Sequence, residues 1–337
     1  MQKRIAIQLF GHLRTFNLTF ELFKNNLLLP NERDGYILDI FIHTWDELDH
    51  QTVNYRNPNG TPLTDKKLLP EDILLANNLY SPKIILVEPQ LACEELIIKE
   101  KIGSFNRSIK GCLNMSYTLF KSSELRNDYQ KTTSVSYDWV IVTRPDILFI
   151  TEFRIDDFLK AYKDFNFLIP KKGLFYANSP FGRGNKIEEP QFQTGSDLIY
   201  FAKPEIIDTA TSLYEEFDKN ININNFYCME SWWADFWRSK NLKPYPLNFR
   251  HGPDFDVVKT SQSALRFKNK VYFLDLSFYK HENQSKINYK LFNKITILSI
   301  KFYNNKTKYL LFGFITLYSI KQSHYLFGIF PILKIKK

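Results

Sequence analysis

An arginine and an aspartate follow a run of apolar residues near the middle of the chain. Residues 139–142 (WVIV) are apolar and largely β-branched, and Arg144-Pro145-Asp146 comes directly after Thr143. The run predicts a strand buried on both faces, which ends at Pro145 because proline cannot donate to a sheet ladder. A guanidinium suits a diphosphate, and a carboxylate suits a divalent metal or a sugar hydroxyl. The alternative is a surface turn in which Arg144 and Asp146 only pair with each other.

Two earlier predicted strands end in groups of the same kind. Gly11 follows the first strand, where its backbone can approach a ligand, and Arg14 falls at the start of the next helix, where phosphates bind. His43-Thr44-Trp45-Asp46 ends the second strand. Trp45 could stack on a base or a sugar and Asp46 could accept hydroxyl hydrogen bonds, or the two could be a core tryptophan and a helix cap.

Further candidate groups lie later in the chain. Asp197 ends Gln193-Thr194-Gly195-Ser196-Asp197, and Glu230 stands at the start of an aromatic-rich helix. Either could be a general base that deprotonates an acceptor hydroxyl, or an ordinary turn or helix-terminal carboxylate. His251 is a candidate metal ligand beside Asp146, or a structural histidine. The Gly-, Asn- and Ser-rich stretch 171–185 is expected to be a loop, either a mobile lid or an ordinary exposed one.

The order of the predicted elements brings the strand ends together. Strands and helices alternate over the first 250 residues, which is typical of a mostly parallel sheet with helices on both faces. The predicted strands cover residues 5–10, 36–43, 83–87, 138–143, 165–169 and 198–201. The predicted helices cover residues 14–28, 71–76, 108–129, 155–162, 204–217 and 229–240. Because the carboxyl ends of parallel strands meet at one edge, we expect the polar strand ends to form one ligand site.

The formal charge of the chain is concentrated at its C-terminal end. The 337 residues carry +9, and residues 281–337 alone hold ten lysines against a single acid, Glu282. Residues 1–280 are therefore formally neutral, which argues against nucleic-acid binding by this part. We expect an enzyme domain over residues 1–280 and a basic, amphipathic appendage over residues 281–337.

The composition indicates a folded chain in a reducing compartment. Hydrophobic residues make up 44% and aromatic residues 16% of the chain, which is enough for a large core. Cys93, Cys112 and Cys228 are widely spaced and match no zinc or disulfide pattern, which favours the cytoplasm. Residues 5–10 are too short for a secretory signal, and no run reaches the ~18 apolar residues of a membrane span. Motifs of P-loop NTPases, GxSxG hydrolases and HExxH proteases are absent.

The basic appendage contains an internal repeat. Residues 309–321 (YLLFGFITLYSIK) align without gaps on residues 324–336 (HYLFGIFPILKIK), and residues 297–301 (ILSIK) repeat the end of the unit. Apolar, aromatic and lysine-rich segments without acids are typical of surfaces that bind anionic membranes, where each lysine contributes about 1 kcal/mol. The alternative is a short hairpin packed on the enzyme domain, with its lysines in water.

These segments resemble the WavE-like and related bacterial glycosyltransferases, which build capsule, lipopolysaccharide or lipooligosaccharide. The matching pieces are IAIQLFGHLRT (residues 5–15), DIFIHTW (39–45), the long helix before YDWVI (137–141), and TRPDI (143–147). The strand after Asp197 and the helix of Glu230 fit more loosely. The likeness covers roughly residues 4–240, and Arg144-Pro145-Asp146 is its most specific part. The appendage repeats also resemble modules of surface-polysaccharide transferases.

The resemblance implies a GT-A-type fold, with a Rossmann-like, mostly parallel central sheet flanked by helices, and a nucleotide-sugar donor. The donor site that it implies contains Gly11, His12, Arg14, Thr15, His43, Trp45, Arg144 and Asp146. In GT-A enzymes an Asp-x-Asp motif usually holds a divalent metal, whereas Arg144-Pro145-Asp146 has one carboxylate. One expectation is therefore Mn²⁺ or Mg²⁺ on Asp146, with His251 as a further ligand. The other is charge neutralisation by Arg144.

The predicted function is transfer of a sugar from a nucleotide-sugar to a glycan or lipid-linked glycan acceptor. Asp197 or Glu230 would act on the acceptor hydroxyl, and the appendage would hold the enzyme at the inner face of the cytoplasmic membrane. On the sequence alone, Asp146→Asn is expected to abolish transfer and to leave the fold intact. One alternative is a transferase that moves a phosphoryl-type group onto capsule sugars. The other is a non-catalytic, membrane-attached scaffold of polysaccharide assembly.

Overall fold

The chain forms two compact units, Met1–Thr260 and Ser261–Lys337. The computed structural model describes residues 3–49, 67–92, 97–99, 106–164, 169, 171–178, 198–217 and 229–258, and six strands between residues 286 and 334. Only the backbone is described for residues 97–99, 106–110, 164, 178 and 229–231 and for those six strands. Asp197 and most of the predicted strand 165–169 lie outside the described residues.

A seven-stranded, mostly parallel sheet forms the centre of the first unit. Its strands are β1 (Arg4–Phe10), β2 (Ile37–Trp45), β3 (Ile84–Glu88), β6 (Trp139–Thr143), β8 (Gly173–Asn178), β9 (Tyr200–Ala202) and β10 (Lys243–Arg250). They lie in the order β10-β8-β9-β6-β1-β2-β3, and β9 alone runs antiparallel to its neighbours. The chain is therefore an α/β protein with a Rossmann-like sheet, as the alternation of elements predicts.

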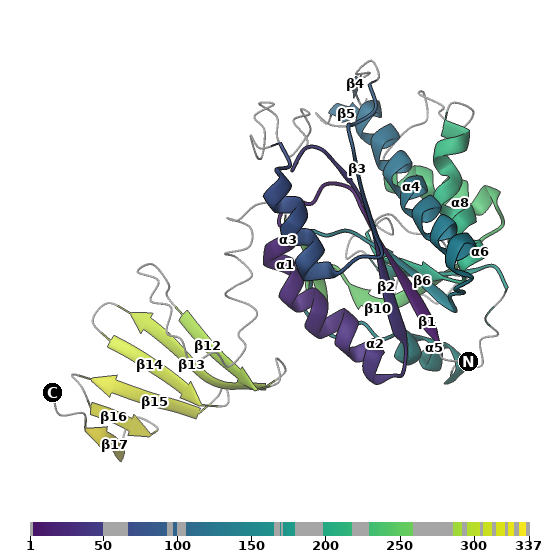
Figure 1. The fold of residues 1–337 in the computed structure, drawn as a ribbon. Helices are drawn as coiled ribbons and strands as arrows, with labels where there is room; N and C mark the ends of the chain where they lie inside the picture. The colour runs from purple at the N-terminus through teal and green to yellow at the C-terminus, as the bar shows by residue number, and fades with distance from the viewer. Residues whose placement is uncertain are drawn as a thin grey trace. The chain divides into compact units, whose positions relative to one another are not determined.

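Helices cover both faces of this sheet (Figure 1). One face carries α1 (Phe16–Phe23), a π-helical turn η1 (Lys24–Leu28), α2 (Leu29–Arg33), α3 (Pro70–Tyr80) and α5 (Ile155–Asp164). The other face carries α4 (Ile109–Thr133), α6 (Pro204–Thr211), a 3₁₀ turn η2 (Ser212–Glu216) and α8 (Met229–Ser239). The described part of the unit also contains two short strand pairs, β4 (Ile97–Lys99) with β5 (Asn106–Ser108) and β7 (Ile147–Phe149) with β11 (Phe255–Val257).

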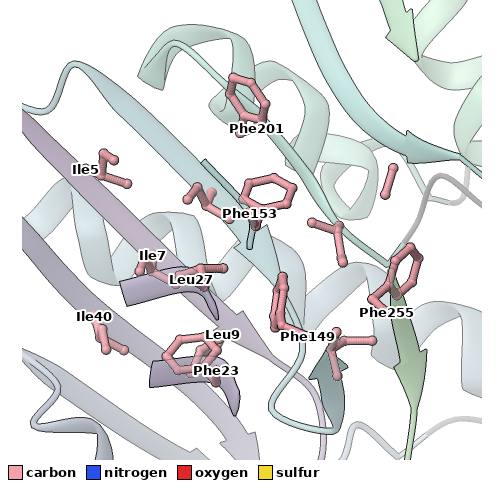
Figure 2. Close-up of a cluster of buried hydrophobic side chains, with 14 of the residues drawn as sticks. Ile5, Ile7, Leu9, Phe23, Leu27, Ile40, Phe149, Phe153, Phe201 and Phe255 are labelled. Atoms are coloured by element: carbon pink, nitrogen blue, oxygen red, sulfur yellow. The ribbon is translucent and has the colours of Figure 1, made fainter. Parts of the chain in front are cut away.

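Figure 2 shows part of the buried core on the α1 face of the sheet. Ile5, Ile7 and Leu9 alternate along β1 and are fully buried there. Phe149 packs against Phe23 of α1, with ring centroids 6.0 Å apart. Each such side chain stabilises the fold by roughly 1.5–3 kcal/mol through its burial. This core fixes β1 and the segment after β6 against the same helix.

Polar side chains of α1, η1 and α2 also hold the segment that follows Arg144. They donate to backbone carbonyls that the end of β6 would otherwise leave without partners. The bonds run from Thr19 to Pro145 (2.5 Å), from Asn26 to Phe149 (2.7 Å) and from Asn31 to Phe153 (2.7 Å). Since buried carbonyls need such partners, the path of residues 145–153 is set by the first helix of the chain.

Most of the predicted elements are confirmed within a few residues, with two differences. The first helix begins at Phe16, because Arg14 has the left-handed φ of +48°, and helical structure continues through η1 and α2 to Arg33. The expected loop 171–185 is wrong in part, since it contains β8. Residues 174–177 (LFYA) are all buried between β9 and β10, so tertiary pairing makes this apolar run a strand. The rest of that stretch lies outside the described residues.

The second unit contains a six-stranded antiparallel sheet. Its strands, in chain order, are β12 (Lys286–Leu291), β13 (Ile295–Tyr303), β14 (Lys306–Leu311), β15 (Ile315–Ile320), β16 (Ser323–Leu326) and β17 (Phe330–Lys334). Each strand pairs with the next one along the chain. The appendage is therefore larger than the short hairpin that was its alternative reading. Among the helices that the structure describes, none has the length and apolar character that crossing a membrane requires.

Candidate functional site

Four parallel strands end at one edge of the main sheet. From two of them, β1 and β6, the chain continues to opposite sides of the sheet. Strands β1, β2, β3 and β6 run the same way, with Leu9 of β1 beside Thr143 of β6. After β1 the chain leads to β2 and β3 on one side, and after β6 it leads to β8, β9 and β10 on the other. Open α/β sheets bind ligands at such a switch point, outside the carboxyl ends of the strands. The residues that follow Phe10 and Thr143 therefore form the candidate site.

A buried aspartate at this switch point is held by two arginines. The Asp146 side chain has no exposed surface, and its Oδ1 lies 2.9 Å from Arg144 Nε. Its Oδ2 lies 2.5 Å from Arg144 Nη2 and 2.7 Å from Arg14 Nη1. Arg14 also donates from Nε to Asp49 Oδ1 at 2.6 Å. These four side chains form one connected chain of ion pairs, Arg144–Asp146–Arg14–Asp49, which we call the switch-point network.

Electrostatics keeps the switch-point network ionised. Burial acts to raise the pKa of Asp146, but the charges of Arg144 and Arg14 outweigh it and hold this pKa below its usual value. Burial acts to lower the pKa of Arg14, and the charges of Asp146 and Asp49 outweigh that effect and raise it. With two cations and two anions, the network is neutral as a whole. Its ion pairs fix both guanidiniums before any ligand arrives.

The backbone beside the network is shaped for a close approach. Gly11 has a φ of +88°, which glycine adopts freely, and no atom lies within 4 Å of the place where a Cβ would be. Arg14 has a φ of +48°, which costs a non-glycine residue roughly 1–2 kcal/mol. Such strain persists only where surrounding contacts enforce it, and here the two ion pairs of Arg14 do so. The turn between β1 and α1 thus presents a bare backbone next to a fixed arginine.

Arg144 is more exposed than Arg14 or Asp146. Its side chain is 15% exposed, against 8% for Arg14 and 0% for Asp146. It uses Nε and Nη2 for Asp146, and no residue in the described ranges accepts a hydrogen bond from its Nη1. A guanidinium whose orientation is fixed loses little freedom when it binds an anion, so it suits the bidentate recognition of phosphate.

The donor set at Asp146 does not fit a divalent cation. Both carboxylate oxygens already accept hydrogen bonds from guanidiniums, which a metal would have to displace. His251 is not brought to this carboxylate. It bridges to Phe255, which pairs with Phe149 at the end of the β7–β11 ladder away from Asp146, and its Nε2 lies 3.0 Å from Asp256 Oδ1. Within the described part of the chain, no three His, Cys, Asp or Glu side chains are grouped as metal ligands.

A second polar cluster supports the glycine turn from the α4 face. Thr118 Oγ1 accepts a hydrogen bond from the Gly11 N–H at 3.0 Å and lies 2.6 Å from His43 Nδ1. His43 Nε2 lies 2.8 Å from Glu88 Oε2, and the Tyr117 hydroxyl donates to the same oxygen at 3.1 Å. Glu88 ends β3, so this cluster connects the ends of β1, β2 and β3 through α4.

The hydrogen bonds of the second cluster indicate which of its atoms carry protons. Burial lowers the pKa of His43 more than the neighbouring Glu88 raises it, so the imidazole is neutral at pH 7. Burial acts to raise the pKa of Glu88, but the bonds from His43 and Tyr117 hold it below its usual value. The ionised carboxylate needs a donor, so we assign the proton of His43 to Nε2. The Thr118 hydroxyl then donates to Nδ1, and its oxygen is left to accept from Gly11.

The remaining predicted donor residues near this edge all contact other residues of the protein. Trp45 is 2% exposed, because its ring stacks on Tyr117 (centroids 5.8 Å apart) and meets His43 edge-on at 5.1 Å. This matches the core-tryptophan alternative and leaves little of the ring for a base. Thr15 is buried and donates to the carbonyl of Val258. His12 Nε2 lies 2.7 Å from Gln90 Nε2 at the ends of β1 and β3.

The two predicted catalytic carboxylates are not tested by the geometry. Asp197 lies outside the described residues, and Glu230 belongs to α8 without a described side chain. Sequence reasoning missed Asp49, Glu88, Tyr117 and Thr118. Glu88 could have been found, because it directly follows an apolar run and precedes Pro89, like the other strand ends. Nothing in the sequence marks Thr118 within its helix.

No protein-family model matches this chain, and no curated protein matches its sequence. The class of the protein is therefore defined by its own fold and site. It is an α/β protein with a Rossmann-like sheet and a pair of fixed arginines at the switch point.

Proposed function

We propose that the protein is a GT-A-type glycosyltransferase that moves a sugar from a nucleotide-sugar donor to a glycan acceptor of capsule, lipopolysaccharide or lipooligosaccharide. The observation that carries the proposal is the convergence of Arg14, Arg144 and the open Gly11 turn at the switch point of the sheet. This edge is where α/β sheets bind phosphorylated ligands. A mostly parallel sheet with helices on both faces supports the same fold type.

In this mechanism, Arg144 stabilises the negative charge that develops on the departing nucleoside diphosphate. Fixed donors aimed at developing charge usually give the largest electrostatic contribution to catalysis. Asp146 does not contact the donor. It positions Arg144 and Arg14, because both of its oxygens are engaged by their guanidiniums. The Gly11 backbone N–H is already bonded to Thr118, so this turn contributes close approach and no further donor.

The acceptor side of the reaction is proposed by chemistry alone. Asp197 or Glu230 would activate or orient the acceptor hydroxyl as a general base. The basic appendage would hold the enzyme at the inner face of the cytoplasmic membrane, close to lipid-linked acceptors. Mn²⁺ or Mg²⁺ would have no place on Asp146 as its oxygens are occupied in this structure, so we propose that Arg144 neutralises much of the diphosphate charge.

Nucleotide binding tests the proposal most directly. Calorimetric titration of the full chain with UDP, GDP and CMP, with and without Mn²⁺, should identify one nucleotide that binds. Arg144→Gln should then weaken binding of that nucleotide roughly 10- to 100-fold, since a charge-assisted hydrogen bond contributes about 1.5–3 kcal/mol. The corresponding nucleoside, which lacks the phosphates, should bind the variant and the wild type equally.

Arg33→Gln is the matched control. It makes the same change at an exposed arginine, which is 64% exposed and pairs with Glu152 at the surface. Its nucleotide affinity should equal that of the wild type. If no nucleotide binds the wild type, the scaffold alternative is favoured instead. If a nucleotide binds but only non-sugar donors are hydrolysed, the phosphoryl-type transferase is favoured.

A further inference from the structure

The sheet of the C-terminal unit is built from three copies of one hairpin. Residues 289–301 (YKLFNKITILSIK) share Tyr, Leu-Phe, Ile-Thr and Ser-Ile-Lys, at the same positions, with residues 309–321, on which residues 324–336 also align. Each copy carries one pair of neighbouring antiparallel strands, namely β12–β13, β14–β15 and β16–β17. The repeat found in the sequence therefore extends over the whole sheet.

One row of residues across this sheet is basic and aromatic. Residues paired across neighbouring antiparallel strands share a face of the sheet. The pairing joins Lys286 to Lys301, Lys301 to Lys308, Lys308 to Tyr318, and Tyr318 to Tyr325. We call this the lysine row. Three lysines thus lie side by side on one face, in a segment whose single acid is Glu282.

The next row lies on the opposite face and is apolar. It runs across all six strands and consists of Ile287, Ile300, Tyr309, Leu317, Leu326 and Phe330. We call this the apolar row. Because successive residues of a strand belong to opposite faces, each member of the apolar row is adjacent in sequence to a position of the other face. The sheet is therefore amphipathic, with the lysine row on one face and the apolar row on the other.

This sorting creates two requirements that the sheet does not meet by itself. Like charges directly opposite each other destabilise an antiparallel pair, so the lysine row favours contact with a polyanion. An apolar sheet face is stable only when it is removed from water. Among the described residues of Ser261–Lys337, this one sheet is the only layer, so the unit has no second layer of its own there.

We propose that the C-terminal sheet docks flat on an anionic lipid bilayer, with the apolar row at the acyl boundary and the lysine row just outside the headgroup layer; this inference rests on the membrane attachment in the proposed function and names the surface that makes it. The dimensions allow both contacts at once. The headgroup region is roughly 5–7 Å deep on each side of a bilayer. Side chains reach about 5 Å to either side of a sheet, which is half of the ~10 Å spacing of two packed sheets, so the lysine row lies within a Debye length of about 8 Å from the lipid phosphates. Tyrosines in the same rows suit this interface.

A second copy of the chain, bound to the apolar row, would meet only one of the two requirements. Two apolar rows could pack face to face as a sandwich, which would remove them from water. The three adjacent lysines would then remain on the outer faces without any anion. A bilayer with anionic lipid meets both requirements, whereas a second copy meets one. The charge of the unit therefore decides in favour of the bilayer.

Vesicle co-sedimentation of the full chain tests this proposal. The protein should bind vesicles of phosphatidylcholine with phosphatidylglycerol (3:1), and bind pure phosphatidylcholine vesicles much more weakly. The double variant Lys301→Gln/Lys308→Gln should lower the partition constant roughly 30-fold, because each lysine near an anionic surface contributes about 1 kcal/mol. High salt should weaken binding of the wild type and change that of the variant less.

Two further variants complete the design. Lys160→Gln/Lys163→Gln removes the same charge from exposed lysines of α5 in the other unit and should leave the partition constant unchanged. Leu317→Asp should lower it by 10-fold or more, since burial of a leucine contributes roughly 1.5–3 kcal/mol. All five tryptophans precede residue 238, so their fluorescence verifies that the first unit stays folded in each variant.

Equal binding to both vesicle types, or no binding to either, would overturn the proposal. A stable dimer that ignores vesicles and that Leu317→Asp converts to a monomer would assign the apolar row to a second copy instead. None of these measurements involves nucleotide binding or sugar transfer. Failure of the docking proposal is therefore distinguishable from failure of the proposed function.

Discussion

For Asp146→Asn, the effect expected from the structure differs most from the effect expected from the sequence. The replacement keeps the shape of the side chain and removes its charge. On the sequence alone this change should spare the fold, because a strand-end carboxylate is usually solvated. Here the carboxylate is fully buried between Arg144 and Arg14, whose side chains are only 15% and 8% exposed. The amide would leave the two buried guanidiniums with Asp49 as their only anion in the switch-point network.

The expected loss of stability is large. Removing one partner of a buried ion pair costs about 3–5 kcal/mol, because the remaining charge stays desolvated without compensation. A folded domain is stable by about 5–15 kcal/mol in total, so the variant should fold but unfold at clearly lower denaturant. Urea unfolding followed by tryptophan fluorescence measures this, because every tryptophan lies in the first unit. Asp128→Asn, at an aspartate 68% exposed beside Lys131, is the control and should change stability by less than about 1 kcal/mol.

The pH dependence gives the same experiment a second readout. The pKa of Asp146 is held below its usual value in the folded protein, so the unfolded chain binds this proton more readily. Its contribution to stability is therefore complete above the unfolded pKa of about 3.9 and is lost as pH falls from there through the lower folded pKa. The stability difference between wild type and Asp146→Asn should shrink in that window. A difference below 1 kcal/mol at pH 7, or one that is unchanged down to pH 3, would refute the role assigned to this carboxylate.

Three further predictions concern the turn after β1 and the cluster that supports it. Gly11→Ala should cost roughly 1–2 kcal/mol of stability through its φ of +88° and also weaken nucleotide binding, whereas Gly35→Ala, with a φ of +87°, should affect stability alone. Thr118→Val should leave the Gly11 N–H unsatisfied, with a loss of about 1–3 kcal/mol in thermal or urea unfolding that Thr118→Ser restores. The pKa of His43 is lowered by burial, so the stability it contributes is complete above about 6.5 and falls as pH drops from there toward its folded pKa. Unfolding curves at pH 7.5 and 5.5 should show a smaller pH effect in His43→Gln, and an equal effect would contradict the neutral tautomer.

Local chemistry was sufficient to predict the scaffold of the site. Apolar runs ended by Gly11 and Pro145 identify strands and their ends without knowledge of the fold. The alternation of these strands with helices then implies a parallel sheet whose ends share one edge. The meeting of Gly11, Arg14 and Arg144 follows from that reasoning. Glu88 could have been predicted in the same way, because it ends the third strand.

The sequence alone could not predict which partner each polar group has. Asp146 is bonded to a neighbour two positions away and to Arg14, 132 positions away, and only packing against α1 brings the latter into range. The burial of Trp45 likewise depends on a distant residue, because Tyr117 of α4 stacks on its ring. Similarly, a repeat in the appendage is visible in the sequence, whereas the register that sorts lysines from aliphatic residues needs the strand pairing.

The sequence by itself determined where strands end and which charged residues stand there, because apolar periodicity and proline act over a few neighbouring residues. Only the tertiary structure decided whether those charges face a ligand or each other. Burial and ion pairing depend on what packs against a side chain from distant parts of the chain. At this switch point, that packing made Asp146 the anchor of two arginines and left Arg144 as the more exposed of the two.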